Sequence, residues 1–165
     1  MRPLGQSKPR GVRGGGRPEP ARRRGARRFD VFLAHASCDG DQVESIASAL
    51  KRRGLKPWLD RWHMPPGRVF QDALEEVLPA IRAVAVFVGR GGIGPWEHIE
   101  LRAAISQFVK RGLPVIPVLL PGTGETPSLP LFLQEFGWVR FVDLDDPRAL
   151  DSLEFGITGR HPRDE

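Results

Sequence analysis

The feature that most constrains the fold is a regular alternation of short apolar runs with amphipathic segments, which begins at Phe29. The apolar runs predict strands at 29–34, 55–59, 83–88, 113–120 and 137–142. Apolar residues at helical spacing predict helices at 39–53, 69–78, 96–110, 131–135 and 147–155. Strands that alternate with helices predict a parallel sheet with helices on both faces. Five strands over this length match a flavodoxin-like sheet of order 2-1-3-4-5.

In such a sheet, ligands bind beyond the carboxyl ends of the strands, where the strand order reverses between the first and third strands. The loops at that place are 35–40 and 89–95, and the second is rich in glycine. This second loop leads into Trp96 and Glu100, which are four residues apart and share one face of a helix. An aromatic plane beside a carboxylate at a glycine loop predicts a place for a nucleotide sugar.

Several other kinds of site are excluded by the same loops. The segment 34–40 has a single glycine, too few for a dinucleotide fingerprint, and the chain contains no P-loop or HExxH motif. A phosphate-receiver domain needs an aspartate where Val88 and Gly89 stand. The four histidines are scattered, so no metal site is expected. Cys38 and the pair Asp39 and Asp41 are interpreted as loop and helix-cap residues.

The charge is divided unevenly along the chain of 165 residues. Residues 1–28 carry a net charge of +9, so 29–165 carry −4. The Arg, Gly and Pro composition of 1–28 predicts a disordered tail. A solvated tail is the first interpretation, a start site assigned too far upstream the second, and a nucleic-acid arm the third. No aromatic residue interleaves with its charge, as it usually does in nucleic-acid modules.

The remainder is expected to be one domain over 29–159, with a short C-terminal tail at 160–165. The single cysteine excludes an internal disulfide and a zinc site of several thiolates, which favours a reducing, cytoplasmic setting. No apolar run is long enough to predict a membrane span, and no secretory signal is recognised.

Four segments in order resemble those of a bacterial Toll/interleukin-1 receptor (TIR) domain of the NAD-cleaving type. They are FDVFLAH at 29–35, GLKPWLD at 54–60, PGR at 66–68, and GPW at 94–96 followed by Glu100 as W-x-x-x-E. VIPV at 115–118 is also similar to the family's fourth strand. The likeness covers 29–159.

The resemblance implies cleavage of the bond between nicotinamide and ribose in NAD+, which is the substrate, with no other cofactor and no metal. It implies Glu100 as the catalytic residue, whereas Glu97 lies about 100° round the helix from Trp96. Residues expected to contact the substrate are Trp96, Ala34, His35, Arg68 and Phe70. Each has a plainer interpretation: Trp96 and Phe70 as core, His35 as a loop residue, Arg68 as a solvated charge, and Glu100 as an acid favoured by the helix dipole.

The loop 61–68 resembles the segment that the family uses for assembly, through Arg61, Trp62, His63, Pro66 and Gly67. The sequence departs from the family at Ala34, where serine is common, and at Arg61 and His63, where acidic residues are common. The expected partners are NAD+, other TIR domains and an activating protein. A non-enzymatic TIR adaptor is the alternative function, and a nucleic-acid-directed role for the basic tail is the weakest. The product, ADP-ribose or a cyclic isomer, stays open.

Overall fold

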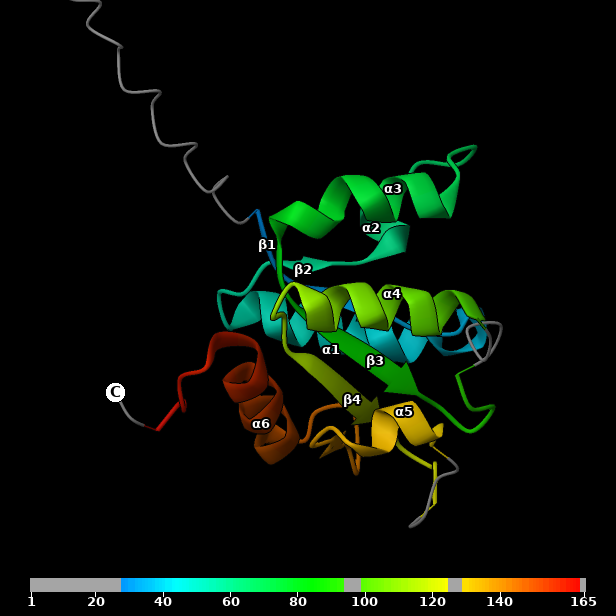
Figure 1. Cartoon of the computed structure of the whole chain (residues 1–165). Coiled ribbons are helices and arrows are strands. Elements are labelled where there is room, and N and C mark those ends of the chain that lie inside the picture. The colour runs from blue at the N-terminus through cyan, green and yellow to red at the C-terminus, as the bar shows by residue number, and fades with distance from the viewer. Residues whose placement is uncertain (1–27, 94–98, 125–128, 164–165) are drawn as a thin grey trace, which may run out of the picture.

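The sheet is the centre of the molecule, and the computed structural model describes it within residues 28–93, 99–124 and 129–163. Five parallel strands in these ranges form one sheet of order β2-β1-β3-β4-β5 (Figure 1). The strands are β1 (Phe29–Ala34), β2 (Pro57–Trp58), β3 (Ile81–Val88), β4 (Val115–Leu119) and β5 (Val139–Arg140). The predicted order and the parallel arrangement are confirmed.

Helices cover both faces of this sheet, as predicted. One apolar cluster joins the strands to α1 (Gly40–Arg52) and α6 (Pro147–Thr158). A second cluster, on the other face, joins them to α3 (Phe70–Val77), α4 (Ile99–Lys110) and α5 (Leu131–Gln134). The remaining helical pieces are α2 (Asp60–His63) and two 3-10 turns at Ser37–Asp39 and Leu78–Ala80.

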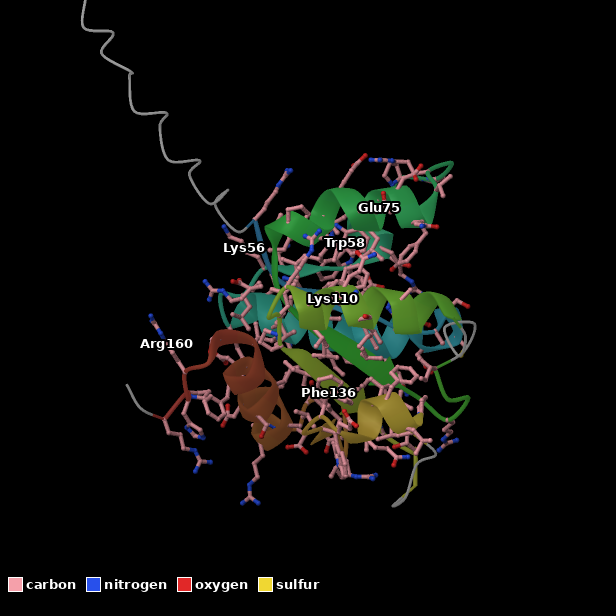
Figure 2. The ribbon with its side chains drawn as sticks, in the orientation of Figure 1. Lys56, Trp58, Glu75, Lys110, Phe136 and Arg160 are labelled. Carbon is pink, nitrogen blue, oxygen red and sulfur yellow. The ribbon has the colours of Figure 1, made fainter. Side chains whose placement is uncertain are left out.

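The central strand β3 shows how the sequence builds both clusters. Ala83, Ala85 and Phe87 belong to the cluster under α1 and α6, whereas the valines between them belong to the cluster under α3 and α4. Side chains of a strand alternate between its two faces, so a strand covered on both sides reads as a continuous apolar run. Trp58 of β2 packs between α3 and α4 in the view of Figure 2.

The ends of α1 and α6 are fixed by capping and by ion pairs between the two helices. Gly54 follows α1 with φ +85°, and Gly159 follows α6 with φ +73°, a backbone region that glycine adopts easily. Arg53 Nη1 lies 2.7 Å from Asp151 Oδ1 and 2.9 Å from Glu154 Oε2. The hydrogen bond from Arg53 lowers the pKa of Asp151. The paired side chains therefore join α1 to α6 beside the sheet.

The structure differs from the prediction in the segment 61–68, which was expected to be a loop throughout. Its first part is helical, because α2 begins at Asp60 and Met64 N donates to Asp60 O at 2.8 Å. The helix ends before Pro65 and Pro66, since proline lacks an N–H and disfavours a helical residue before it. Met64 is accordingly extended, with φ −109° and ψ 105°.

Some predicted helices and strands are present with shorter or longer bounds, and other predicted segments lie outside the described residues. β2 and β5 are two residues each, and α6 continues past Phe155 to Thr158. The predicted tail up to residue 27, the helix start at Trp96 and residues 125–128 and 164–165 lie outside the described residues. None of the described helices is long and apolar enough to cross a membrane.

Candidate functional site

A pocket of about 140 Å³ lies at the carboxyl ends of β1 and β2, beside the first residue of α3. The residues that line it are Leu33, Ala34, His35, Ser37, Trp58, Asp60 and Phe70. Three of the predicted substrate-binding residues, Ala34, His35 and Phe70, therefore meet in one hollow. Ala34 and His35 lie where β1 ends, Trp58 lies at the end of the neighbouring parallel strand β2, and Phe70 reaches the same edge from the start of α3.

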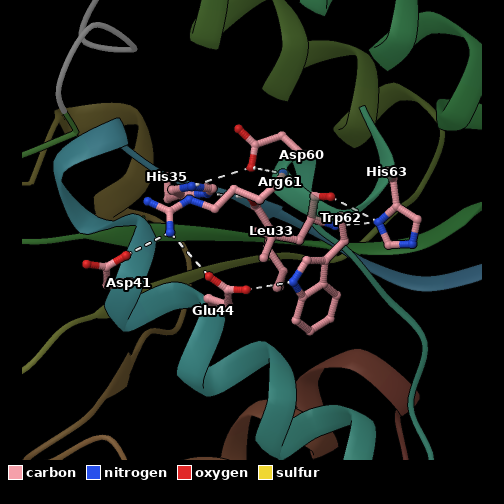
Figure 3. Close-up of polar contacts among 9 residues, drawn as sticks. Leu33, His35, Asp41, Glu44, Asp60, Arg61, Trp62 and His63 are labelled. Carbon is pink, nitrogen blue, oxygen red and sulfur yellow. Dashed lines mark hydrogen bonds and ion pairs between the residues drawn. The ribbon is translucent and has the colours of Figure 1, made fainter. Parts of the chain in front are cut away.

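His35 is one of the polar side chains of the pocket wall, and it is held on two sides. Its Nδ1 lies 3.0 Å from Leu33 O, and a carbonyl only accepts, so Nδ1 carries the donated proton. Its Nε2 faces Asp60 Oδ1 at 3.7 Å (Figure 3). The side chain is 5% exposed. The imidazole is therefore held in one orientation, with Nε2 toward a carboxylate that also lines the pocket.

Aromatic rings form a rigid apolar side of the same pocket. Trp58 stacks on Phe32 with ring centroids 4.9 Å apart and an interplanar angle of 20°. Phe70 lies 6.4 Å from Phe32, and His63 stacks on the outer side of Trp58 at 5.9 Å. Such ring pairs add to the stability given by burial alone. Phe70 packs against the core, as its plainer interpretation implies, and it also lines the pocket.

Asp39 occupies the N-cap position of α1, as its interpretation as a helix-cap residue implies, but its side chain makes no capping hydrogen bond there. Its carboxylate is instead buried against Gly89, where an added Cβ would overlap the carboxylate oxygens. Burial raises the pKa of Asp39, and the nearby charge of His35 partly offsets this. Oδ2 has no hydrogen-bond partner among the described residues. Asp39 thus packs between the loop that follows β1 and the turn that follows β3.

Gly89 is the first residue of the turn that leaves β3 toward α4. It forms an antiparallel bridge with Gly92, whose N–H donates to Gly89 O at 3.1 Å. Because Gly89 is buried against Asp39, the root of this turn has no room for a side chain. The contact between Asp39 and Gly89 therefore joins the loop after β1 to the turn that precedes α4, the helix that contains Glu100.

The start of the predicted assembly loop is fastened to α1 (Figure 3). Arg61 Nη1 lies 2.7 Å from Asp41 Oδ1 and 3.2 Å from Glu44 Oε2. Trp62 Nε1 donates to Glu44 Oε1 at 2.8 Å, and Lys51 lies over the Trp62 ring. The unusual positive charge of Arg61 is therefore matched within the chain.

The rest of that loop is exposed and lies apart from the pocket. Gly67 has φ +90°, and Pro66 and Gly67 are both exposed. His63 Nδ1 is within hydrogen-bond distance of the Leu59 backbone. Arg68 Nη2 bonds to Glu76 Oε1 at 2.6 Å, and Arg68 is not among the described residues that line the pocket.

The predicted catalytic segment is described only in part. Trp96 and Glu97 lie outside the described residues. Glu100 is the second residue of α4, whose backbone is described. Among the described residues, no group of three or more His, Cys, Asp or Glu side chains could hold a metal ion.

Sequence reasoning did not select Ser37, Trp58 or Asp60 as pocket residues. A signal was available, because all three lie at or just beyond the carboxyl ends of β1 and β2, where the fold places its ligands. Trp58 and Asp60 were noted only as part of the resemblance at 54–60. The burial of Asp39 could not be read from the sequence, since it depends on how two loops pack.

The fold and the pocket define a flavodoxin-like α/β domain with a candidate site beyond the carboxyl ends of β1 and β2. Of the two loops predicted to frame the site, 35–40 contributes to the described lining and 89–95 does not. The family model described as the TIR domain matches residues 31–154, and the chain belongs to that family. A comparison with curated proteins gave no match.

Solved structures with a similar fold include three from metazoans. A TIR-STING receptor from C. gigas, in complex with 2',3'-cGAMP, is 19% identical with a TM-score of 0.66, over 79% of this chain and 39% of that one. A second structure of a TIR-STING receptor from C. gigas is 18% identical, with a TM-score of 0.63 over 79% and 40% of the two chains. The TIR domain of the Toll-related receptor TRR-2 from Hydra magnipapillata is 18% identical, with a TM-score of 0.57 over 77% and 95%. At these identities the likeness concerns the fold, and this chain matches about two fifths of either receptor chain.

Proposed function

We propose that this TIR domain is of the bacterial, NAD-cleaving kind and breaks the nicotinamide–ribose bond of NAD+. The products are nicotinamide and ADP-ribose or a cyclic isomer, and the activity serves a defence or signalling effector in the cytoplasm. The observation that carries the proposal is the pocket at the carboxyl ends of β1 and β2, where Ala34, His35 and Phe70 meet in a chain of the TIR family. The W-x-x-x-E pattern that ends at Glu100 supplies the carboxylate.

The reaction needs little acid–base help from the protein. Nicotinamide leaves NAD+ as a neutral molecule, because the electron pair of the breaking C–N bond cancels the charge of the pyridinium ring. The ribose then carries an oxocarbenium-like positive charge, as in other glycoside cleavages. In this proposal Glu100 hydrogen-bonds the ribose hydroxyls and stabilises that charge. Water, which loses a proton, or an atom of the adenine ring then forms the new bond at the ribose carbon.

The other pocket residues have binding roles in this proposal. Phe70 and Trp96 pack against flat rings of the substrate, and His35 with Ala34 forms the floor beside the ribose. The imidazole is well held for this role by its bond to Leu33 O and its approach to Asp60. Arg68 reaches a phosphate only if it leaves Glu76, with which it is paired in this conformation.

Two features support activation by self-assembly. A volume of about 140 Å³ is smaller than the roughly 300–1,000 Å³ typical of ligand sites, and NAD+ is a dinucleotide. The arginines of the adjoining segment, Arg61 and Arg68, are both engaged by carboxylates of the same chain. In this proposal a second copy, joined through the surface around Pro66 and Gly67, completes the walls of the site and the contacts to the diphosphate.

The test is nicotinamide release from NAD+ by purified protein at high concentration. Glu100→Gln keeps the size of the side chain but loses its charge, so we expect a decrease of about a hundredfold or more in rate. Glu97→Gln is the matched control, because it removes the carboxylate three positions earlier in the sequence and is expected to leave the rate unchanged. Equal rates for wild type and both variants would contradict the assignment of Glu100.

A non-enzymatic adaptor is the second candidate function. It is favoured by the pairing of Arg61 and Trp62 with α1, which makes α2 a fixed surface rather than a mobile binding loop. The two candidates differ in a simple way. An adaptor self-associates through this surface but releases no nicotinamide at any concentration.

A further inference from the structure

A second, larger pocket of about 750 Å³ lies at the opposite end of the sheet. Its walls come from Arg82 near the start of β3, from the last turn of α6, and from the chain that follows, including Arg160 and His161. Helix α6 begins after β5 and runs back along the parallel strands, so its C-terminal turn reaches their amino ends. This pocket is therefore remote from the candidate site around His35, and nothing in the proposed function uses it.

The positive charge of this pocket exceeds the negative charge that faces it. Glu154 lies in the wall, but its carboxylate is bonded to Arg53, which also holds Asp151. The charge of Arg163 also acts on Asp151. Among the described residues, neither Arg82 nor Arg160 forms an ion pair.

Arg82 is the residue of this pocket whose guanidinium group is left without its full set of hydrogen bonds among the described residues. Its Nε is buried and has no hydrogen-bond partner in the described part of the chain. A buried donor without a partner is costly, and arginine presents its donors in a planar fork that fits a phosphate or carboxylate. Arg160, which lies just beyond α6 (Figure 2), adds a second guanidinium to the same pocket.

A flat apolar surface lies beside these cations. Phe155 is 46% exposed, which is high for a large apolar residue, and it meets the His161 ring edge-on at 5.3 Å. Arg163 N donates to His161 Nδ1 at 3.2 Å, so the neutral ring carries its proton on Nε2. The pocket thus combines guanidinium groups, an imidazole N–H donor and an exposed aromatic face.

We infer that this pocket binds a nucleotide, with its phosphates at Arg82 and Arg160 and its base against Phe155. Arginine forks bind phosphate through two parallel hydrogen bonds, and aromatic side chains stack on bases of any sequence. The volume lies within the range of pockets for molecules of this size. The inference is independent of the NAD+-cleaving activity, because the two pockets lie at opposite ends of the sheet.

The experiment is a calorimetric titration of the full chain with ADP, pyrophosphate and adenosine. Loss of the charged fork in Arg82→Met is expected to weaken ADP and pyrophosphate about tenfold or more. Arg160→Met is the second variant, because this exposed residue can change without disturbing the fold. Arg148→Met, at the other end of α6, is the matched control and is expected to bind ADP as wild type does.

The variant Phe155→Ala tests binding of the base separately from binding of the phosphates. We expect it to weaken the binding of ADP and to leave the binding of pyrophosphate unchanged, since the aromatic face contacts only the base. Added salt should weaken ADP binding to wild type, as charges at an open pocket are screened. The inference is overturned if wild type gives no saturable ADP binding, or if Arg82→Met and Arg160→Met both bind ADP as tightly as Arg148→Met.

Discussion

The arginines at the two ends of the sheet differ in whether they form ion pairs. At the carboxyl end, Arg61 is bonded to Asp41 and Glu44, and Arg68 is bonded to Glu76. At the amino end, Arg82 and Arg160 face a larger pocket with no ion pair among the described residues. The end that holds the candidate catalytic site is therefore balanced in charge, and the opposite end is basic.

This difference indicates how each end meets a ligand. The carboxyl end offers a small shaped pocket in which His35 Nε2 faces Asp60 Oδ1 at 3.7 Å, and the charge of His35 also acts on the buried Asp39. Tight recognition of a diphosphate there requires cations from a second copy or a change of pairing. At the amino end, Arg82 and Arg160 form no ion pair with any described residue, so we expect this end to bind an anion as a single chain.

The largest effect on stability is expected at Gly89, which belongs to the carboxyl end. Gly89→Ala places a Cβ onto the Asp39 carboxylate, and overpacking of this kind costs about 1–3 kcal/mol. Gly91→Ala is the matched control in the same turn, because its Cβ would meet nothing within 4 Å. Urea unfolding of both variants measures the difference. Equal stabilities would show that the turn does not rest on Asp39.

A smaller, local effect is expected when α2 loses its pairing with α1. Arg61→Ala removes both carboxylate contacts, so the backbone amides of α2 should exchange with deuterium faster. Arg68→Ala is matched to it in exposure but pairs with α3, so it should leave the α2 amides unchanged. Hydrogen-exchange mass spectrometry makes the comparison. The same exchange rate in α2 for wild type and Arg61→Ala would argue against a fastened assembly loop.

The smallest effect is the pH dependence that Asp39 adds. Burial raises its pKa in the folded chain above the ordinary 3.8, so the folded state keeps a proton that the unfolded state has lost. Stability therefore falls as pH rises from 3.8 through the folded pKa and is level above it. Asp39→Asn should lack this fall, so its stability relative to wild type should increase with pH in that window. If the stabilities of wild type and Asp39→Asn changed with pH in the same way across that window, the raised pKa of the buried Asp39 would be contradicted.

The sheet order could be predicted because the apolar runs and helix stops are local signals. Ala83–Val88 is covered on both faces and reads as one apolar run, and Gly54 ends α1 as expected. The loop at 61–68 was mispredicted in its first half, because Asp60–His63 is held as a helix by contacts with α1 that are distant in sequence.

The candidate site was predictable to the extent that topology determines it. The alternating pattern predicts that the end of β1, with Ala34 and His35, lies at the ligand-binding edge of the sheet, whereas Phe70 at the start of α3 was predicted from the family resemblance. The contribution of Asp60 and the burial of Asp39 depend on side-chain packing between loops, which carries no local signal. The pocket of Arg82 and Arg160 was missed, since their positions at 82 and 160 show no motif.

The most direct test of the proposed activity is nicotinamide release measured across a wide range of protein concentrations at saturating NAD+. Because the described pocket encloses only about 140 Å³ and its neighbouring arginines are paired, one copy is expected to be nearly inactive. We predict a rate per subunit that increases steeply with protein concentration and is lost in Glu100→Gln. No release from wild type at concentrations where it is assembled would contradict the proposed activity.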